Sequence, residues 1–177
     1  MSIIDRLLGR KKAEAEFYKV KFKTYSDFYG NFAVDYPKEW KYDPSVIIDE
    51  DSYAVVFHSG KTEAHFRVGV DFNLPVKFDL KEHAKKEIED PSAGVYSKAC
   101  KSKFRKYKCF ETDYEYEHEG KAYIGEKKIF QTEDKVFSVF YTYPADEKEN
   151  MRKIFNHMVK SLVIYPSKTK LFKRALR

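Results

Sequence analysis

Lysines mixed with aromatic residues between positions 98 and 108 are the feature of this sequence best suited to chemistry. The segment holds six basic residues and no acidic residue. Positive charge interleaved with aromatic rings is typical of nucleic-acid-binding surfaces, and a local excess of basic residues indicates an anionic partner more generally. The alternative is a solvated run of charges without a partner. The candidate partner-binding residues are Lys98, Lys101, Lys103, Phe104, Arg105, Lys106, Tyr107 and Lys108.

The N-terminal segment offers a second candidate surface. Apolar residues at helical spacing precede three consecutive basic residues, and the candidate surface anchor consists of Ile3, Ile4, Leu7, Leu8, Arg10, Lys11 and Lys12. A helix of about two turns is too short to be stable alone in water. We therefore expect it to dock on its own domain, on a second protomer or on an anionic membrane surface.

The sequence contains no catalytic motif. It has no G-x-S-x-G nucleophile elbow, and neither Cys100 nor Cys109 lies in a catalytic signature. Its seven glycines are scattered singly along the chain, so no glycine-rich phosphate loop is present. We therefore expect a protein that is not an enzyme and that uses no cofactor.

Two pairs of potential metal ligands stand out but remain incomplete. His83 and Glu87 lie four residues apart on an expected helix, and His58 and His65 flank an expected turn. Metal sites need three or four ligands, and neither pair has a third ligand nearby in the sequence. We expect solvated side chains and no metal site.

A row of carboxylates alternates with mainly aromatic residues farther along the chain. Such a row could bind a hard cation or a basic peptide, but basic residues on both sides favour cross-strand ion pairs on an exposed sheet face. We expect the structural role. The carboxylates are Glu111, Asp113, Glu115 and Glu117, and the basic neighbours are Lys101, Lys103, Arg105, Lys121, Lys127 and Lys128.

Tyr36 and Trp40, on either side of Pro37, form a candidate small pocket. The alternative, which we favour, is that Trp40 covers one end of the hydrophobic core.

These residues require a mainly antiparallel sheet and two helices to position them. Period-two alternation bounded by turn residues predicts the strands, and amphipathic spacing after D-x-x-E caps predicts the helices. Residues 1–27 are expected to form an appendage, 28–166 one domain and 167–177 a basic tail. The expected strands are 31–36, 53–58, 64–74, 96–104, 107–117, 122–131, 135–143 and a closing strand within 161–165; the expected helices are 80–89 and 146–162.

The bulk composition agrees with a sheet-rich, soluble protein. Aromatic residues make up 17% of the 177 residues, and they favour half-buried sheet surfaces. The net charge is +6, with the basic residues concentrated towards the two ends of the chain. Two cysteines are too few for a disulfide framework, and we find no signal peptide or spanning segment. We therefore expect a cytoplasmic protein with reduced thiols.

Aromatic and turn positions recur along the chain in a recognisable order. They are Phe32, Val34, Tyr36, Pro37 and Trp40 in an early F-x-V-x-Y-P-x-x-W segment, Tyr114 and Tyr116 before the turn Glu119-Gly120, and the later strand V-F-S-V-F-Y-T with its amphipathic helix. This order resembles the PsbP-like family, which includes extrinsic subunits of the oxygen-evolving photosystem and whose fold occurs in a Ran-binding nuclear-import factor. The resemblance covers roughly residues 28–166. It implies an α+β fold, an α/β/α sandwich around an antiparallel sheet of about six strands, and a non-enzymatic role.

We therefore expect a non-catalytic binding or accessory domain whose partner is a protein or a small ligand. Two alternatives stay open. One is a peripheral protein held at an anionic membrane surface by its N-terminal segment and basic tail. The other is a nucleic-acid-associated protein that acts through residues 98–108.

Overall fold

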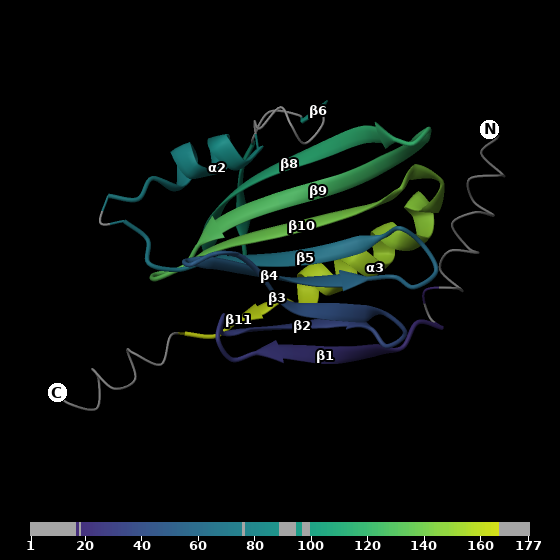
Figure 1. Cartoon of the computed structure of the whole chain (residues 1–177), viewed down its shortest axis with the longest axis horizontal. Coiled ribbons are helices and arrows are strands. Elements are labelled where there is room, and N and C mark those ends of the chain that lie inside the picture. The colour runs from purple at the N-terminus through teal and green to yellow at the C-terminus, as the bar shows by residue number, and fades with distance from the viewer. Residues whose placement is uncertain (1–16, 18, 76, 89–94, 97–99, 167–177) are drawn as a thin grey trace. The chain divides into compact units, whose positions relative to one another are not determined.

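The computed structural model describes residues 17, 19–75, 77–88, 95–96 and 100–166 (Figure 1). The candidate anchor at residues 3–12, the tail at 167–177 and Lys98 lie outside the described residues. The chain divides into two compact units, one formed by Met1–Glu39 with Arg152–Arg177 and the other by Trp40–Met151.

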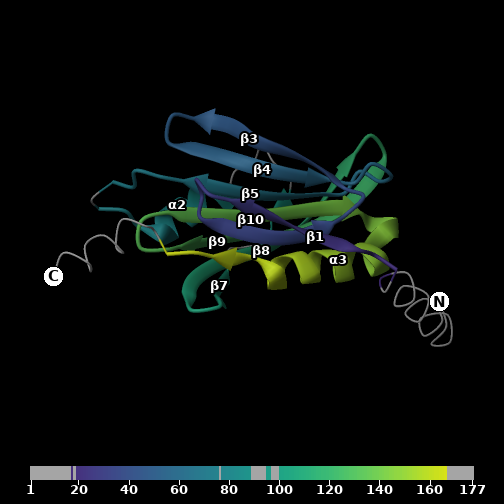
Figure 2. The same cartoon turned by 90° about the horizontal axis from the view of Figure 1, so that it is seen from below.

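The unit from Trp40 to Met151 is built on an antiparallel sheet. Its described residues form eight strands, of which seven follow the order β3-β4-β5-β10-β9-β8-β6 and the eighth, β7, also pairs with β8 (Figures 1 and 2). The strand expected to be central, β10, lies between β5 and β9. The strands are β3 Lys41–Asp49, β4 Ser52–His58, β5 His65–Asp71, β6 Val95–Tyr96, β7 Cys100–Phe104, β8 Tyr107–His118, β9 Lys121–Gln131 and β10 Val136–Pro144.

Two-residue turns set the register of the predicted hairpins. Arg105-Lys106 joins β7 to β8, with φ of 54° at Arg105. Glu119-Gly120 joins β8 to β9, and its φ values of 50° and 74° are both positive, as in a type I′ turn. This backbone twist matches the twist of the flanking strands, so both hairpins form where the sequence predicted them.

The two faces of this sheet differ because side chains alternate along each strand. One face, termed the core face, carries fully buried apolar side chains, namely Val55, Phe57, Phe66, Val68, Val70 and Phe137. The other face, termed the helix face, packs against helix α2, Leu80–Ile88. There Ala84 and Ile88 form a buried cluster with Ile129 and Val136.

Helix α2 begins where its predicted cap stands. The Asp79 carboxylate accepts hydrogen bonds from the backbone N–H groups of Lys81 (2.8 Å) and Glu82 (3.3 Å). These bonds satisfy two of the N–H groups that a helix leaves without partners at its first turn. The cap therefore fixes the start of α2 beside the sheet.

The other unit contains a small antiparallel sheet. Its described residues form three strands in the order β1-β2-β11, with bounds β1 Phe22–Asp27, β2 Phe32–Pro37 and β11 Val163–Ile164. β11 is the closing strand that the sequence predicted. Beyond it, the N–H of Tyr165 donates to the carbonyl of Asn31 at 2.8 Å, so the pairing extends to the start of β2.

The expected single sheet of about six strands is too simple, because the described residues form two sheets of eight and three strands. β3 was missed because Pro44 and charged residues obscure its alternation, and the pairing of β3 with β4 is itself irregular. The expected strand at 96–104 corresponds to two separate strands, β6 and β7. The α+β class itself is confirmed, with two α-helices among the described residues.

Helix α3, Lys148–Ser161, begins differently from the prediction. A 3₁₀ turn, η2 at Ala145–Glu147, precedes it, and Pro144, the N-cap position of this turn, makes no side-chain cap bond. Asp146 therefore lies inside this turn rather than capping the helix, because the fixed φ of proline (−57° here) starts the turn earlier. Of the predicted apolar positions, Val159 is half-buried and the other five are buried, namely Met151, Ile154, Phe155, Met158 and Leu162.

Within the part of the chain that the structure describes, no helix combines the length and the apolar character needed to cross a membrane.

Candidate functional site

A hollow of about 900 Å³ opens between the β7–β8 hairpin and the start of α2. We term it the hairpin pocket. The capped first turn of α2 forms one wall and the predicted basic hairpin forms the other. It is lined by Phe78, Asp79, Leu80, Lys81, Lys101, Ser102, Lys103, Lys106, Tyr107, Lys108, Cys109, Phe110 and Gln131.

Positive charge dominates the lining of the hairpin pocket. Five of the lining residues are exposed lysines, and the single acidic one, Asp79, is occupied as the cap of α2. Across the described ranges, no carboxylate forms an ion pair with any of these five lysines, whereas Lys127 binds Glu87 at 2.8 Å and Lys121 binds Glu63 at 2.7 Å. The five are Lys81, Lys101, Lys103, Lys106 and Lys108.

Two of these lysines face each other across the hairpin. Lys103 and Lys108 occupy directly opposite positions of β7 and β8, and Lys101 lies opposite Phe110 on the same face. Like charges at opposite positions destabilise a strand pair by roughly 0.2–1 kcal/mol. Folding therefore gains nothing from this pair, and its positive field is available to an anionic ligand.

Aromatic packing holds the hairpin in place. The Phe104 ring is buried and stacks on Phe130 with 4.5 Å between centroids, and half-buried Tyr107 stacks on the same ring at 5.7 Å. Arg105 and Lys106 lie over the rings of Phe104 and Tyr107 at 6.0 and 5.4 Å. Of the predicted partner-binding aromatics, Phe104 thus belongs to the packing and Tyr107 lines the pocket.

The register explains why the pocket lysines have no cross-strand acid. We expected Lys101 and Lys103 to face the carboxylate row, but Cys100 lies opposite Glu111 and Lys101 lies opposite Phe110. The two lysines therefore point to the helix face and the carboxylates to the other face. Within the described ranges, the expected cross-strand pairing of this row forms at Glu111 and Lys128, 2.5 Å apart.

The histidine pairs form no metal cluster among the residues that the structure describes. His58 and His65 do lie opposite each other across the β4–β5 hairpin, and burial lowers the pKa of His65. Near His83, the Glu87 carboxylate is engaged by Lys127. The Glu87 carboxylate is thus held by an ion pair, and the His65 imidazole is half-buried.

Both cysteines are free thiols. Cys100 is exposed and lies opposite Glu111, whereas Cys109 is buried and lies opposite Ser102. Burial raises the pKa of the Cys109 thiol above its ordinary value. A buried thiol of high pKa is a poor nucleophile. Cys109 therefore forms part of the wall of the hairpin pocket and is not expected to react there.

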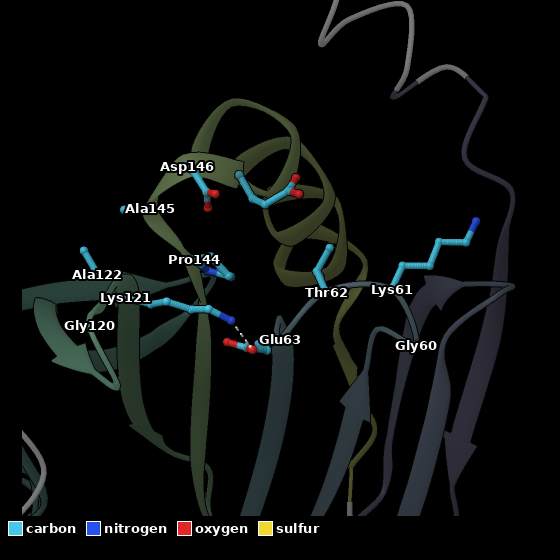
Figure 3. Close-up of a pocket in the computed structure, with 11 residues that line it drawn as sticks. Gly60, Lys61, Thr62, Glu63, Gly120, Lys121, Ala122, Pro144, Ala145 and Asp146 are labelled. Carbon is cyan, nitrogen blue, oxygen red and sulfur yellow. Dashed lines mark hydrogen bonds and ion pairs between the residues drawn. The ribbon is translucent and has the colours of Figure 1, made fainter.

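A second hollow of about 740 Å³ lies where the β4–β5 and β8–β9 turns meet η2 (Figure 3). Its basic and acidic side chains are mixed. Lys121 donates to the Glu63 carboxylate at 2.7 Å, as the dashed line in Figure 3 marks, and the Tyr123 hydroxyl donates to the other oxygen of the same group. Because these charges neutralise one another, this hollow offers a charged ligand less net attraction than the hairpin pocket does.

Tyr36 and Trp40 line neither of these two hollows. Both side chains are buried, at 3% and 7% exposure, and they belong to different compact units. Their burial agrees with the alternative that we favoured, in which these aromatic residues serve the core.

Comparisons with protein-family models and with curated proteins each gave no match. A comparison with solved structures did. CyanoP, the cyanobacterial PsbP of Synechocystis sp. PCC 6803, matches with a TM-score of 0.60 and 14% sequence identity over 82% of this chain and 94% of CyanoP. The chain has a PsbP-like fold. The resemblance predicted from sequence is thus confirmed for the fold.

Two other solved structures show the same PsbP-like fold at low identity. LpqN, a protein involved in cell envelope biogenesis of Mycobacterium tuberculosis, matches with a TM-score of 0.51 and 10% identity over 84% of this chain and 92% of its own. A protein from Bacteroides thetaiotaomicron VPI-5482 matches with a TM-score of 0.54 and 18% identity over 82% of this chain. This chain spans about half of the Bacteroides protein, 49%.

Proposed function

We propose that this PsbP-like domain is a non-catalytic binding module whose hairpin pocket holds an acidic segment of a partner protein. The observation that carries the proposal is the set of five exposed pocket lysines that make no ion pair with a carboxylate of the described residues. Elsewhere in the same unit, lysines such as Lys127 and Lys128 do pair with acids. Lysines that gather around one hollow without a carboxylate to pair with indicate that their counter-charges come from a partner.

The lining also specifies the kind of segment. Lysine ammonium groups act as mobile point charges, which suit carboxylates presented at variable spacing. Between them, Phe78, Leu80 and Phe110 offer partly buried apolar surface that one aliphatic or aromatic side chain would cover. The ligand is therefore an acidic peptide with an apolar anchor. The charges would raise the association rate, and the anchor would slow dissociation.

Binding of a fluorescein-labelled peptide rich in Glu, with one central Phe, tests this proposal by fluorescence anisotropy. We expect Lys103→Gln with Lys108→Gln to weaken binding at least about tenfold, because two charges at the pocket are lost. The matched control, Lys38→Gln with Lys41→Gln, removes the same charge from two exposed lysines outside the pocket and should change the affinity less than about twofold. Equal losses in both variants, or equal binding of the Gln-substituted peptide, would rule the proposal out.

Nucleic acid is the second candidate ligand, because Tyr107, which is half-buried and has Lys106 over its ring at 5.4 Å, is one of the residues that line the pocket. Single-stranded oligonucleotides combine stacking with charge neutralisation. For this ligand, the log of affinity should fall by about 0.7 per phosphate contact for each unit of log salt. An oligo-dT that binds more tightly than the acidic peptide and displaces it would favour this candidate.

We also propose the α/β/α sandwich and the cytoplasmic location expected from the sequence. The PsbP-like fold and the packing of α2 on one face of the larger sheet support the sandwich.

The absence of catalytic motifs from the sequence supports a binding role over an enzymatic one. Turnover of any substrate that disappears when one identified side chain is replaced would contradict the non-catalytic role.

A further inference from the structure

The β1–β2 turn carries the most exposed large apolar side chains of the described residues. Phe28 is 86% exposed and Tyr29 is 76% exposed, and the nearby β11 segment adds Val163 at 37% and Tyr165 at 50%. Of the five exposed large apolar residues in the described ranges, only Tyr42 lies elsewhere. Four such side chains on neighbouring segments are unusual for a soluble surface.

Strand pairing brings these residues together within one unit. Ile164 of β11 lies opposite Phe32, and the Tyr165 N–H donates to the carbonyl of Asn31 at 2.8 Å. The β11 segment therefore runs beside the end of β2 that follows the turn (Figure 1). We term Phe28, Tyr29, Val163 and Tyr165 the aromatic tip.

The segments that form the aromatic tip carry no charge. Residues 28–34 and 162–166 contain no acidic or basic residue, although 35% of the chain is charged. The nearest acid, Asp27, is 8% exposed, and its carboxylate accepts the Gly30 N–H at 2.6 Å and the Tyr25 hydroxyl at 3.0 Å. The tip therefore presents rings to solvent without a neighbouring exposed carboxylate on the turn.

The sequence that follows the tip is basic. Residues 167–177 begin two positions after Tyr165 and contain five basic residues and no acidic residue, namely Lys168, Lys170, Lys173, Arg174 and Arg177. Aromatic side chains settle at the headgroup level of membranes. Each nearby lysine or arginine adds an attraction to anionic lipid.

We propose that the aromatic tip docks on the surface of an anionic lipid membrane, with the basic tail as the second signal that reversible anchoring requires. The exposed parts of four side chains cover less than the roughly 800 Å² per partner of a standard protein interface. A lipid headgroup layer, by contrast, accepts protruding rings without a matching shape. The tip and the hairpin pocket belong to different compact units, so the two proposals can fail independently.

Cosedimentation of the full-length protein with vesicles tests this proposal. Vesicles of phosphatidylcholine are compared with vesicles that contain about 30% phosphatidylserine, since anionic lipid attracts basic segments. We expect Phe28→Ser with Tyr29→Ser to lower partitioning to the anionic vesicles at least about tenfold. The matched control Tyr42→Ser, at the exposed aromatic of the other unit, should leave it unchanged. Replacing the five basic tail residues with Gln should abolish the preference for phosphatidylserine.

A fluorescence measurement tests the proposal without relying on variants that lose binding. Tryptophan placed by Phe28→Trp should shift its emission to the blue with anionic vesicles and be quenched by brominated lipid, whereas Tyr42→Trp should show neither effect. Unchanged Phe28→Trp emission, or unchanged partitioning of the Phe28→Ser/Tyr29→Ser variant, overturns the proposal. The proposal is also overturned if the wild-type protein does not bind vesicles but binds oligo-dT through the same tip residues.

Discussion

The ring of Tyr114 occupies the space that a side chain at Gly125 would need. The two residues lie directly opposite each other on β8 and β9, and the Tyr114 hydroxyl donates to the carbonyl of Tyr141 at 2.7 Å. A Cβ atom at position 125 would clash with the Tyr114 hydroxyl and with the Tyr141 carbonyl oxygen. The glycine thus lets a tyrosine on one strand reach over its neighbour to the next strand.

Gly125→Ala should therefore destabilise the larger sheet. We expect the free energy of unfolding to fall by about 2–4 kcal/mol, because the methyl group displaces the ring and breaks the buried hydrogen bond. Urea denaturation followed by circular dichroism measures this change. Gly60→Ala is the matched control, since nothing lies within 4 Å of a Cβ at that turn position. Similar losses in the two variants would show that the Tyr114 contact is unimportant.

Removing the lysine pair of the hairpin pocket should stabilise the fold even as it weakens ligand binding. For Lys103→Gln with Lys108→Gln, we expect the free energy of unfolding to rise by roughly 0.2–1 kcal/mol, because repulsion between opposite positions is relieved. The gain should shrink in 1 M NaCl, where charges are screened. A loss of stability would mean that these lysines support the hairpin rather than a ligand.

Stability should fall in mildly acidic solution because of His65. Burial lowers its pKa below the ordinary 6.5, and the charges of Arg67 and His58 act in the same direction. The unfolded chain therefore binds a proton more readily than the folded one, and the free energy of unfolding decreases as the pH falls through about 6.5. Urea denaturation at pH 7.5 and pH 5.5 should show a smaller decrease for His65→Gln than for wild type. Equal decreases would exclude His65 as the cause.

The two cysteines should react at different rates with a thiol reagent. At neutral pH we expect a maleimide to modify exposed Cys100 in the folded protein and to leave Cys109 unmodified, because Cys109 is buried and its pKa is raised. Intact-mass measurement should find one label before denaturation and two after it. In the control Cys100→Ser, the folded protein should take up no label. Rapid double labelling would show that the hairpin opens easily.

The β7–β8 hairpin could be predicted from the sequence, whereas the pocket beside it could not. Arg105-Lys106 stands between two alternating runs, so local pattern alone locates the turn. A two-residue turn at that point also places Lys101 opposite Phe110, and this simple count would have separated the lysines from the carboxylate row. The approach of Asp79 and Leu80 to the hairpin is a tertiary contact between distant segments. The hydrophobic periodicity of a sequence does not predict contacts between distant segments.

The aromatic tip illustrates a second limit of sequence patterns. Phe28 and Tyr29 precede an apolar strand, and nothing in the sequence pattern shows whether their rings are buried or exposed. The positive φ of 59° at Asn31 marks a turn that leaves both rings in solvent. Hydrophobic periodicity identifies which residues could be buried, but exposure depends on what packs against them.

The pairing of β11 with β2 joins the last described strand of the chain to one of the first. During synthesis, the contiguous stretch Trp40–Met151 leaves the ribosome before Val163 and Ile164 do, so the larger sheet can fold while the smaller one still lacks its third strand. The smaller unit is therefore completed only after the whole of the larger sheet has been synthesised. A nascent chain halted before residue 163 would expose the edge of β2 to other unpaired strands, which makes premature termination a route to aggregation.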